Sequence, residues 1–384
     1  MPAPLEIAVS WIAAQRPAME DLLARLVSVN SFSGNREGAN AVVDLLLAEC
    51  GGTGLSAERI PSARFGDHLV LSGPARGAPF LLIGHSDTVY PPGVFEGYAS
   101  DGVTARGPGV LDMKGGLVVG LFALRALARA GLLAEVPVRT FVVADEEAGS
   151  PESQAVFRQR APGARAALGL ESGRSGDLIV TRRKGVASVD AVARGVAAHA
   201  GGDHEKGRNA IWSLARFVDR AQALTDYGRG VTVSVGRIEG GTTRNTVPAE
   251  ARCEVDLRYV ASRDGEELLR RLAAAAREAE LEGTRIEVRQ ANARPAMERT
   301  EASAALAVEY GECQREAGLG HGEAPLSGGG SDASVTAALG IPSIDGLGPR
   351  GRGFHTLDEQ VELASLVPKA EALVRFLGRR AAGA

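Results

Sequence analysis

The order of strand and helix patterns in the first half of the chain constrains the fold more than any other feature. Four short apolar runs, each suited to one buried strand, occur there with one long apolar helix pattern that ends at Gly131. The apolar runs are residues 68–73, 80–85, 138–147 and 166–172, and the helix pattern spans residues 115–133. Strands and helices in this alternation form a mostly parallel sheet with crossover helices. We therefore predict an α/β fold with a mixed, mostly parallel sheet sandwiched by helices.

The pattern changes near Arg182. Four runs alternate apolar and polar side chains, and two others repeat with a helical period. The alternating runs are residues 186–196, 230–241, 249–260 and 285–291, and the helical runs are residues 208–224 and 264–283. They predict a four-stranded antiparallel sheet with two helices. Helix patterns resembling those of the first half return at residues 302–317 and 363–379. We expect one α/β domain of residues 1–182 and 294–384, interrupted by an inserted α+β domain of residues 183–293.

Composition excludes several classes of partner. The chain is 45% hydrophobic and its formal net charge is −4, which argues against nucleic acid or an anionic membrane as the main partner. No apolar run approaches the ~18 residues that span a bilayer, and residues 1–26 are typical of one amphipathic helix rather than a signal peptide. Cys50, Cys253 and Cys313 are far apart in sequence. We therefore expect no disulfide framework and a reducing, cytoplasmic location.

Acidic and imidazole side chains gather where the predicted strands end. Those at strand ends are His85, Asp87, Glu146, Glu147 and Glu171, while Asp112 and His355 lie in other loops. Side chains beyond the carboxyl ends of the strands of an open α/β sheet converge in one crevice. Zinc accepts imidazole nitrogen and carboxylate oxygen as ligands, and a carboxylate in excess of the ligands can act as a general base. The sequence therefore favours a zinc site with a spare carboxylate.

Each of these signals has an ordinary structural explanation when it is taken alone. A His-x-Asp at a strand end is more often a hydrogen-bonded pair, the paired acids Glu146 and Glu147 are typical of a solvated strand end, and His355 suits a core position. Several buried, acid-rich strand ends are nevertheless costly to bring together unless cations neutralise them. Competing signatures are absent, since "HEKGR" lacks the second His of a zinc helix and "GGGSDAS" does not fit a nucleophile elbow.

A set of longer motifs resembles one enzyme family. The motifs are "GHSDTV", "GPGVLDMKGG", "DEEAGS", "HAGGDHEKGRNA", "GGTTRNTVPAEARCEVDLRY" and "GGGSDAS". Together they resemble the aminoacylase/carboxypeptidase family of co-catalytic di-zinc metallopeptidases, nearest to the bacterial glutamate carboxypeptidases that cleave folates. The resemblance runs from "SVNSFSGNREG" to "FHTLDE", which is nearly the whole chain. It implies a catalytic di-zinc domain interrupted by a lid and dimerisation domain.

The resemblance also implies a role for each acidic and imidazole residue. One zinc ion would be held by His85, Asp112 and Glu171, and the other by Asp112, Glu147 and His355, so that Asp112 bridges the pair. Asp87 would orient His85. Glu146 would take a proton from the attacking water and pass it to the leaving amine. Cobalt or manganese could replace zinc, and the peptide bond between Asp112 and Met113 is expected to be cis.

Residues of the inserted domain and of one loop match the substrate side of the family's site. His199 matches an oxyanion-assisting histidine that reaches the active site of the other subunit, so a homodimer is expected. Arg258 and Asn245 match residues that grip a free carboxylate, for which a guanidinium is well suited. Gly329 and Gly330 lie in a glycine-rich loop that can approach a substrate closely. By itself, His199 also suits a surface turn, Arg258 an exposed strand position, and the loop a flexible connector.

The expected reaction is hydrolysis of an amide bond with release of a C-terminal amino acid, glutamate above all. In the family that the motifs resemble, aminopeptidases tend to have Asp at the position of Glu171, whereas carboxypeptidases and deacylases have Glu, so the resemblance favours cleavage beside a free α-carboxylate. An N-acyl-amino-acid deacylase, of the acetylornithine or succinyl-diaminopimelate type, is the alternative. A catalytically silent scaffold is a third hypothesis, but such a relative would be expected to lose Glu146 or a metal ligand, and all are present.

Overall fold

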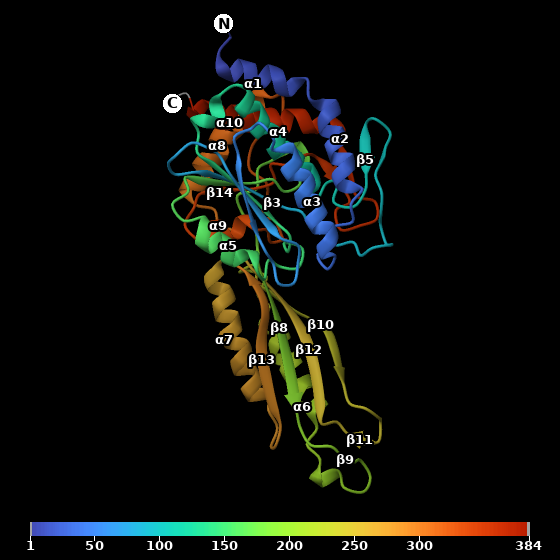
Figure 1. The fold of residues 1–384 in the computed structure, drawn as a ribbon. Helices are drawn as coiled ribbons and strands as arrows, with labels where there is room; N and C mark the ends of the chain where they lie inside the picture. The colour runs from blue at the N-terminus through green and yellow to red at the C-terminus, as the bar shows by residue number, and fades with distance from the viewer. Residues whose placement is uncertain (1, 382–384) are drawn as a thin grey trace. The chain divides into compact units, whose positions relative to one another are not determined.

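The computed structural model describes residues 2–381, which form two units (Figure 1). The first unit comprises the residues up to Arg182, Arg299–Leu326 and the residues from Ser331 onward, and the second comprises Arg183–Glu298 and Ser327–Gly330.

A six-stranded sheet forms the centre of the first unit. In spatial order its strands are β1 (Ser56–Ile60), β2 (His68–Ser72), β6 (Val138–Val143), β3 (Phe80–His85), β7 (Ala166–Gly169) and β14 (Ser343–Ile344). The last four are mutually parallel, whereas β1 and β2 add an antiparallel edge. The predicted mixed, mostly parallel sheet is confirmed, and the carboxyl ends of β6, β3 and β7 lie next to one another.

Helices cover both faces of this sheet, as the apolar runs predict. In β3, Phe80 and Leu82 join one apolar core, while Leu81 and Ile83 join another on the opposite face. The first core includes residues of α1 (Pro4–Ala13), α2 (Arg16–Val27), α3 (Arg36–Glu49), α4 (Lys114–Arg129), α8 (Glu301–Glu316) and α10 (Leu366–Ala381). The second includes residues of α5 (Ser153–Arg160) and α9 (Ala333–Ala338). Among residues 2–381, no helix is both long and apolar enough to cross a bilayer.

The N-terminal stretch differs from the single amphipathic helix that the sequence predicts. It forms two helices, α1 and α2, which are separated at Ala14 and Gln15. Pro17 lies in the first turn of α2, where its missing N–H has no helical partner to lose. A continuous helix would place Pro17 in the interior, where its ring clashes with the preceding turn.

A small sheet in the first unit was not predicted. Its order is β15 (Gly351–Arg352), β16 (Gln360–Glu362), β5 (Thr104–Arg106) and β4 (Ala99–Ser100). Strands of two or three residues are too short to show a period of two, so the sequence carries no clear signal for them. The pairing of β16 with β5 brings the chain that follows His355 alongside the chain that precedes Asp112.

The second unit contains the predicted four-stranded antiparallel sheet. Its order is β10 (Thr232–Gly240), β12 (Glu250–Tyr259), β8 (Gly185–Arg194) and β13 (Arg285–Arg294), and its helices are α6 (Ala210–Gln222) and α7 (Ser262–Ala279). A separate short ladder joins β9 (Ala198–His199) to β11 (Thr246–Val247). Sheet and helices share one apolar core.

The second unit extends beyond the span of 183–293. Strand β13 runs to Arg294, and the backbone of Arg183 bridges to that of Met297. The glycine-rich loop Ser327–Gly330 also belongs to this unit, since the N–H of Lys184 donates to the carbonyl of Ser327 at 2.8 Å.

Four short 3₁₀ helices complete the secondary structure of the described residues. They are η1 (Leu132–Ala134), η2 (Ser175–Asp177), η3 (His204–Lys206) and η4 (Leu363–Ser365). In the first unit, the buried carboxylate of Asp177 forms ion pairs with Lys369 at 3.1 Å and with Arg350 at 2.8 Å, and accepts a hydrogen bond from the N–H of Gly320. This buried charge cluster ties η2 to α10.

Candidate functional site

Three adjacent strand ends and two loops bring the predicted acidic and imidazole residues together in the first unit. His85 is the last residue of β3, Glu146 and Glu147 lie in the turn after β6, and Glu171 follows β7. Asp112 directly precedes Met113 and α4, and His355 lies between β15 and β16. The peptide bond between Asp112 and Met113 is cis, as the family resemblance implies.

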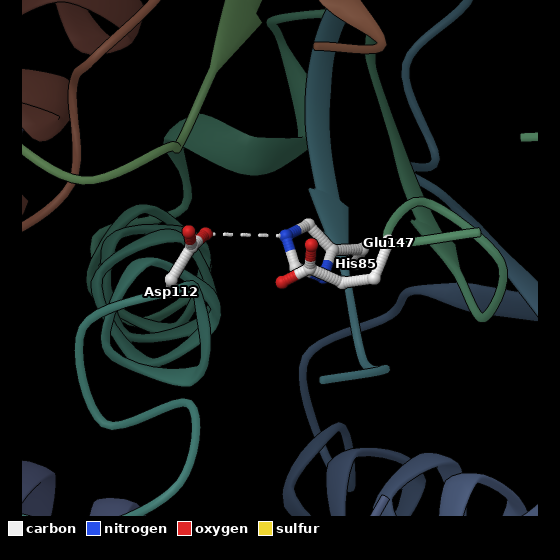
Figure 2. Close-up of side chains that lie close together, drawn as sticks. All are labelled: His85, Asp112 and Glu147. Carbon is white, nitrogen blue, oxygen red and sulfur yellow. Dashed lines mark ion pairs between the residues drawn. The ribbon is translucent and has the colours of Figure 1, made fainter. Parts of the chain in front are cut away.

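His85 faces two carboxylates from a fully buried position. Its Nε2 lies 3.4 Å from Asp112 Oδ1 and 3.7 Å from Glu171 Oε1, and only 1% of its side chain is exposed. Figure 2 shows the imidazole pointing from the end of β3 toward Asp112. This buried nitrogen has no hydrogen-bond partner among residues 2–381. An orphaned imidazole nitrogen aimed at carboxylate oxygens is the arrangement that a metal ion would satisfy.

His355 faces the other oxygen of the same aspartate. Its Nε2 lies 3.4 Å from Asp112 Oδ2 and 3.2 Å from Glu147 Oε2. Asp112 therefore presents one oxygen to each imidazole. Ligand atoms of His85, Asp112 and Glu147 all lie within 4.8 Å of one another (Figure 2). Imidazole nitrogen and carboxylate oxygen are the kinds of ligand that a transition-metal ion accepts, so this cluster could hold a metal.

The cluster strongly perturbs its own acid–base equilibria. Hydrogen bonds to Asp112 and Glu147 raise the pKa of His355 to about 10. Burial acts to lower the pKa of His85, but Asp112, Asp87 and Glu171 outweigh it and raise that pKa well above its usual range. Burial likewise raises the pKa of Glu147 to about 7 and that of Glu171 well above its usual range.

The pKa of Asp112 is shifted in the opposite direction, below its usual value. Burial acts to raise its pKa, but the two imidazoles outweigh burial and hold the pKa far below the usual range. These shifts have one cause, which is that several carboxylates share a low-dielectric site and require positive charge. Protons on the imidazoles or divalent cations can supply that charge.

Asp87 links His85 to the loop that carries the paired acids. The Nδ1 of His85 lies 3.0 Å from the backbone carbonyl of Asp87 and 3.4 Å from its carboxylate, so the carbonyl is the nearer partner. The carboxylate of Asp87 accepts hydrogen bonds from the N–H groups of Glu146 at 3.2 Å and Glu147 at 3.1 Å. It also accepts one from the hydroxyl of Ser33 at 2.6 Å. Asp87 thus positions both paired acids as well as the imidazole.

Glu146 is buried beside the cluster, with 6% of the residue exposed. Its charge adds to the effects of burial and of Asp112 in raising the pKa of Glu171. Ser33 was not anticipated, because a lone serine in a loop carries no distinctive sequence signal, and its role depends on a contact 54 positions along the chain.

The structure brings His199 and Asn245 together within the second unit. His199 pairs with Thr246 across the β9–β11 ladder, and the N–H of Ala200 donates to the carbonyl of Asn245 at 2.9 Å. The Nδ1 of His199 accepts hydrogen bonds from the N–H groups of Gly201 at 3.2 Å and Gly202 at 3.0 Å. Because Nδ1 is the acceptor, Nε2 carries the proton of the neutral imidazole and is a donor.

Arg258 is held in place by a neighbour on its own strand. Its Nε and Nη2 donate to the two carboxylate oxygens of Asp256 at 2.8 and 2.9 Å, and its Nη1 donates to the carbonyl of Gly328 at 3.4 Å. Asp256 was not predicted as a site residue, although its position two residues before Arg258 places both on one face of β12.

The glycine-rich loop has room around it. A Cβ atom on Gly329 would have no neighbour within 4 Å, whereas one on Gly330 would come within 3.3 Å of Val186 and 3.4 Å of Arg294. Packing inside the unit therefore favours glycine at Gly330 but does not require it at Gly329.

Comparison with known proteins identifies the family. The model of peptidase family M20/M25/M40 matches residues 81–379. The chain belongs to this family. Carboxypeptidase G2 of Pseudomonas sp. (strain RS-16) is 30% identical over 374 residues, covering 95% of this chain and 90% of that protein. A succinyl-diaminopimelate desuccinylase of Xanthomonas euvesicatoria pv. vesicatoria (strain 85-10) is 29% identical over 351 residues, covering 83% of this chain and 90% of that protein.

Solved structures of M20 relatives have the same fold. Aminopeptidase PepT of Bacillus cereus ATCC 10987 matches with a TM-score of 0.78 at 23% identity, covering 95% of this chain and 99% of that chain. The M20 family metallo-carboxypeptidase Sso-CP2 of Sulfolobus solfataricus also has a TM-score of 0.78, at 17% identity, with the same coverage. Membership of the M20 family shows an enzyme of the general metallopeptidase or amidohydrolase kind. The family is typically metal-dependent, and the cluster of His85, Asp112 and Glu147 could hold a metal.

Metal uptake should release protons at neutral pH. The neighbouring carboxylates raise the pKa values of both His85 and His355, and an imidazolium has no lone pair for a metal, so Zn²⁺ must displace the protons. We expect the affinity for Zn²⁺ to fall as pH is lowered from about 10, the pKa of His355. Calorimetric titration of chelator-stripped protein near pH 7, in buffers of different ionisation enthalpy, gives the number of protons released.

The substitution His355→Ala should reduce that number, whereas His321→Ala, which removes an exposed imidazole outside the cluster, should leave it unchanged. An observed heat that is independent of the buffer would contradict the protonated cluster.

Proposed function

We propose that this chain is a zinc-dependent metallopeptidase that hydrolyses an amide bond and releases a C-terminal amino acid, with glutamate as the preferred product. The observation that carries the proposal is the shared carboxylate of Asp112, which presents one oxygen to His85 and the other to His355. The likeness to carboxypeptidase G2 over 95% of the chain supports the carboxypeptidase subtype.

Two Zn²⁺ ions per chain are proposed as the cofactors, with Co²⁺ or Mn²⁺ as possible substitutes. One ion would be held by His85, Asp112 and Glu171, and the other by Asp112, Glu147 and His355. When bound, the ions supply Lewis-acid chemistry that polarises a carbonyl and makes water more acidic.

The proton transfers are assigned to Glu146. As the carboxylate in excess of the proposed ligands, it would accept a proton from the attacking water and deliver it to the leaving amine. Asp87 would fix the position of Glu146 relative to His85, because its carboxylate accepts a hydrogen bond from the Glu146 amide and its carbonyl faces the imidazole of His85. A base fixed through its own backbone needs little reorganisation during turnover.

The second unit is proposed to recognise the substrate. The protonated Nε2 of His199, set by the amides of Gly201 and Gly202, is suited to donate to the oxyanion of the tetrahedral intermediate. Arg258 and Asn245 would bind the free carboxylate of the substrate. Because Asp256 holds one edge of the Arg258 guanidinium, the substrate would approach the Nη1 side, where Gly328 lies. The open space beside Gly329 supports close approach of a substrate there.

A homodimer formed through the second unit is part of the proposal. Strand β10 is at the edge of its sheet, and it exposes 55% of Ile238. On α6, Ile211 and Trp212 are exposed by 41% and 61%. Exposed apolar side chains of this size are typical of protein interfaces.

A cytoplasmic location is proposed from the three cysteines, Cys50, Cys253 and Cys313, which are all free and buried.

The second candidate function is N-acyl-amino-acid deacylation. The 29% identity to a succinyl-diaminopimelate desuccinylase over 83% of the chain favours it. Both reactions cleave an amide beside an amino acid with a free carboxylate, so Arg258 and the metal cluster would have the same roles in each.

A substrate panel tests the proposed function. We expect amino-acid release from folyl-glutamate and from dipeptides with a free C-terminal carboxylate. C-terminally amidated counterparts should lose about 10- to 100-fold in kcat/KM, because charge-assisted hydrogen bonds are lost. Amino-acid analysis of the products measures both. Hydrolysis confined to N-acetyl or N-succinyl amino acids would instead favour the deacylase.

The substitution Glu146→Gln should lower kcat by about 10²- to 10⁴-fold, because amide nitrogen cannot relay the proton. Its bound zinc, measured by atomic emission, should match that of the unmodified protein, since Glu146 is not a proposed ligand. The matched control is Glu152→Gln, which should leave kcat near its original value. Glu152 lies six residues after Glu146 and accepts a hydrogen bond from the hydroxyl of Ser62. A protein without bound metal, whose behaviour Glu146→Gln does not change, would favour the silent scaffold.

Mixing two inactive variants tests the proposed role of His199 across subunits. The substitution His199→Ala should reduce turnover far more than zinc content. If His199 serves the site of the partner subunit, mixed dimers of His199→Ala and Glu146→Gln contain one complete site, and activity should partly recover. Sedimentation analysis of the mixture checks the dimer. Absence of recovery in proven mixed dimers would place both residues in the site of one chain.

A further inference from the structure

A fully buried carboxylate that the proposed reaction does not use lies next to the metal cluster. Glu359 comes four residues after His355 and has no exposed surface. Its Oε1 accepts hydrogen bonds from the N–H groups of Leu111 at 2.8 Å and Asp112 at 2.9 Å, and its Oε2 accepts one from Gly109 at 3.1 Å. Backbone amides of a single loop therefore bind both oxygens of this buried carboxylate.

The same residue belongs to the turn that carries His355. The N–H of Glu359 donates to the carbonyl of Thr356 at 3.2 Å, and the N–H of Thr356 donates to the carbonyl of Gly353 at 3.0 Å. The hydroxyl of Tyr90, from the loop after β3, also donates to the Thr356 carbonyl at 2.8 Å. Glu359 thus joins the turn around His355 to the loop of Asp112.

His355 needs such support more than the other proposed ligands. Half of its side chain, 51%, is exposed, compared with 1% for His85. Its backbone has a φ of 62°, in the left-handed region. Non-glycine residues stay in that region only where the surrounding structure holds them there. Little packing is available to a half-exposed ring, so the hydrogen bonds of its turn must set its position.

We propose that Glu359 is a positioning residue, whose carboxylate fixes the spacing between Asp112 and His355 by binding the Asp112 loop from the His355 turn. This inference rests on the proposed metal-dependent function. It predicts that Glu359 controls the ion held by His355 more than the ion held by His85, because His85 is attached to β3 and not to this turn.

The rate of zinc release from purified, metal-loaded protein to a chromogenic chelator tests this proposal. In Glu359→Gln, one carboxylate oxygen becomes an NH₂ group that cannot accept a backbone hydrogen bond. We expect one of two zinc equivalents to leave about 10- to 100-fold faster, as is typical when a partner that orients a metal ligand is removed. The release of the other equivalent should accelerate less, because that ion depends on Glu359 through the shared Asp112 and not through the turn of His355. His355→Ala, which removes the proposed ligand itself, should accelerate the release of the same zinc equivalent as Glu359→Gln.

Asp177→Asn is the matched control for a buried carboxylate that has only a structural role. Asp177 accepts an amide hydrogen bond and pairs with Lys369 and Arg350 in the same unit, so this variant should lower thermal stability without changing zinc release. If Glu359→Gln behaves like Asp177→Asn, the proposal is overturned. If Glu359→Gln does not accumulate as folded protein, the zinc-release rate of Glu359→Asp is measured instead. This variant keeps the carboxylate but shortens the side chain, so faster release of one equivalent would support the proposal and an unchanged rate would overturn it. Unmodified protein that binds no zinc would contradict the proposed function itself.

Discussion

The concentration of carboxylates around Asp112 is the constraint on which the rest of the site depends. Each oxygen of Asp112 faces a different imidazole, and Glu147 and Glu171 lie within 4 Å of those imidazoles. Such a group of acids is stable in a low-dielectric site only when cations or protons accompany it. The raised pKa values of His85 and His355 are a consequence of this requirement. Membership of a typically metal-dependent peptidase family agrees with the same requirement.

The parallel sheet explains how residues far apart in sequence meet. Strands β6, β3 and β7 end side by side, so that the turn after each one delivers an acid or an imidazole to the same place. Asp87 then connects two of these ends, because its carboxylate binds the amides of Glu146 and Glu147 while its carbonyl faces His85. The arrangement is therefore rigid at its strand ends. Its less supported part is the half-exposed turn of His355, which is joined to the remainder through Glu359 and Tyr90.

Within the second unit, hydrogen bonds from neighbouring groups orient the side chains that are proposed to contact the substrate. The amides of Gly201 and Gly202 determine which nitrogen of His199 carries a proton. Asp256 and Gly328 together orient the guanidinium of Arg258. In both cases a polar side chain is fixed by near neighbours in sequence or by the glycine-rich loop.

Sequence patterns alone were enough to predict the sheet of the first unit, the antiparallel sheet of the second, the family and the acids and imidazoles that gather around Asp112. Apolar periodicity reports which residues are buried, and the acids and imidazoles stand at the ends of those runs. The break between α1 and α2 follows a local signal, Pro17, whereas the small sheet that contains β16 and the partners Ser33 and Glu359 were decided by tertiary structure. These features depend on hydrogen bonds between loops distant in sequence or on strands of two or three residues. Neither leaves a periodic signal, because the contacts exist only after the chain has folded.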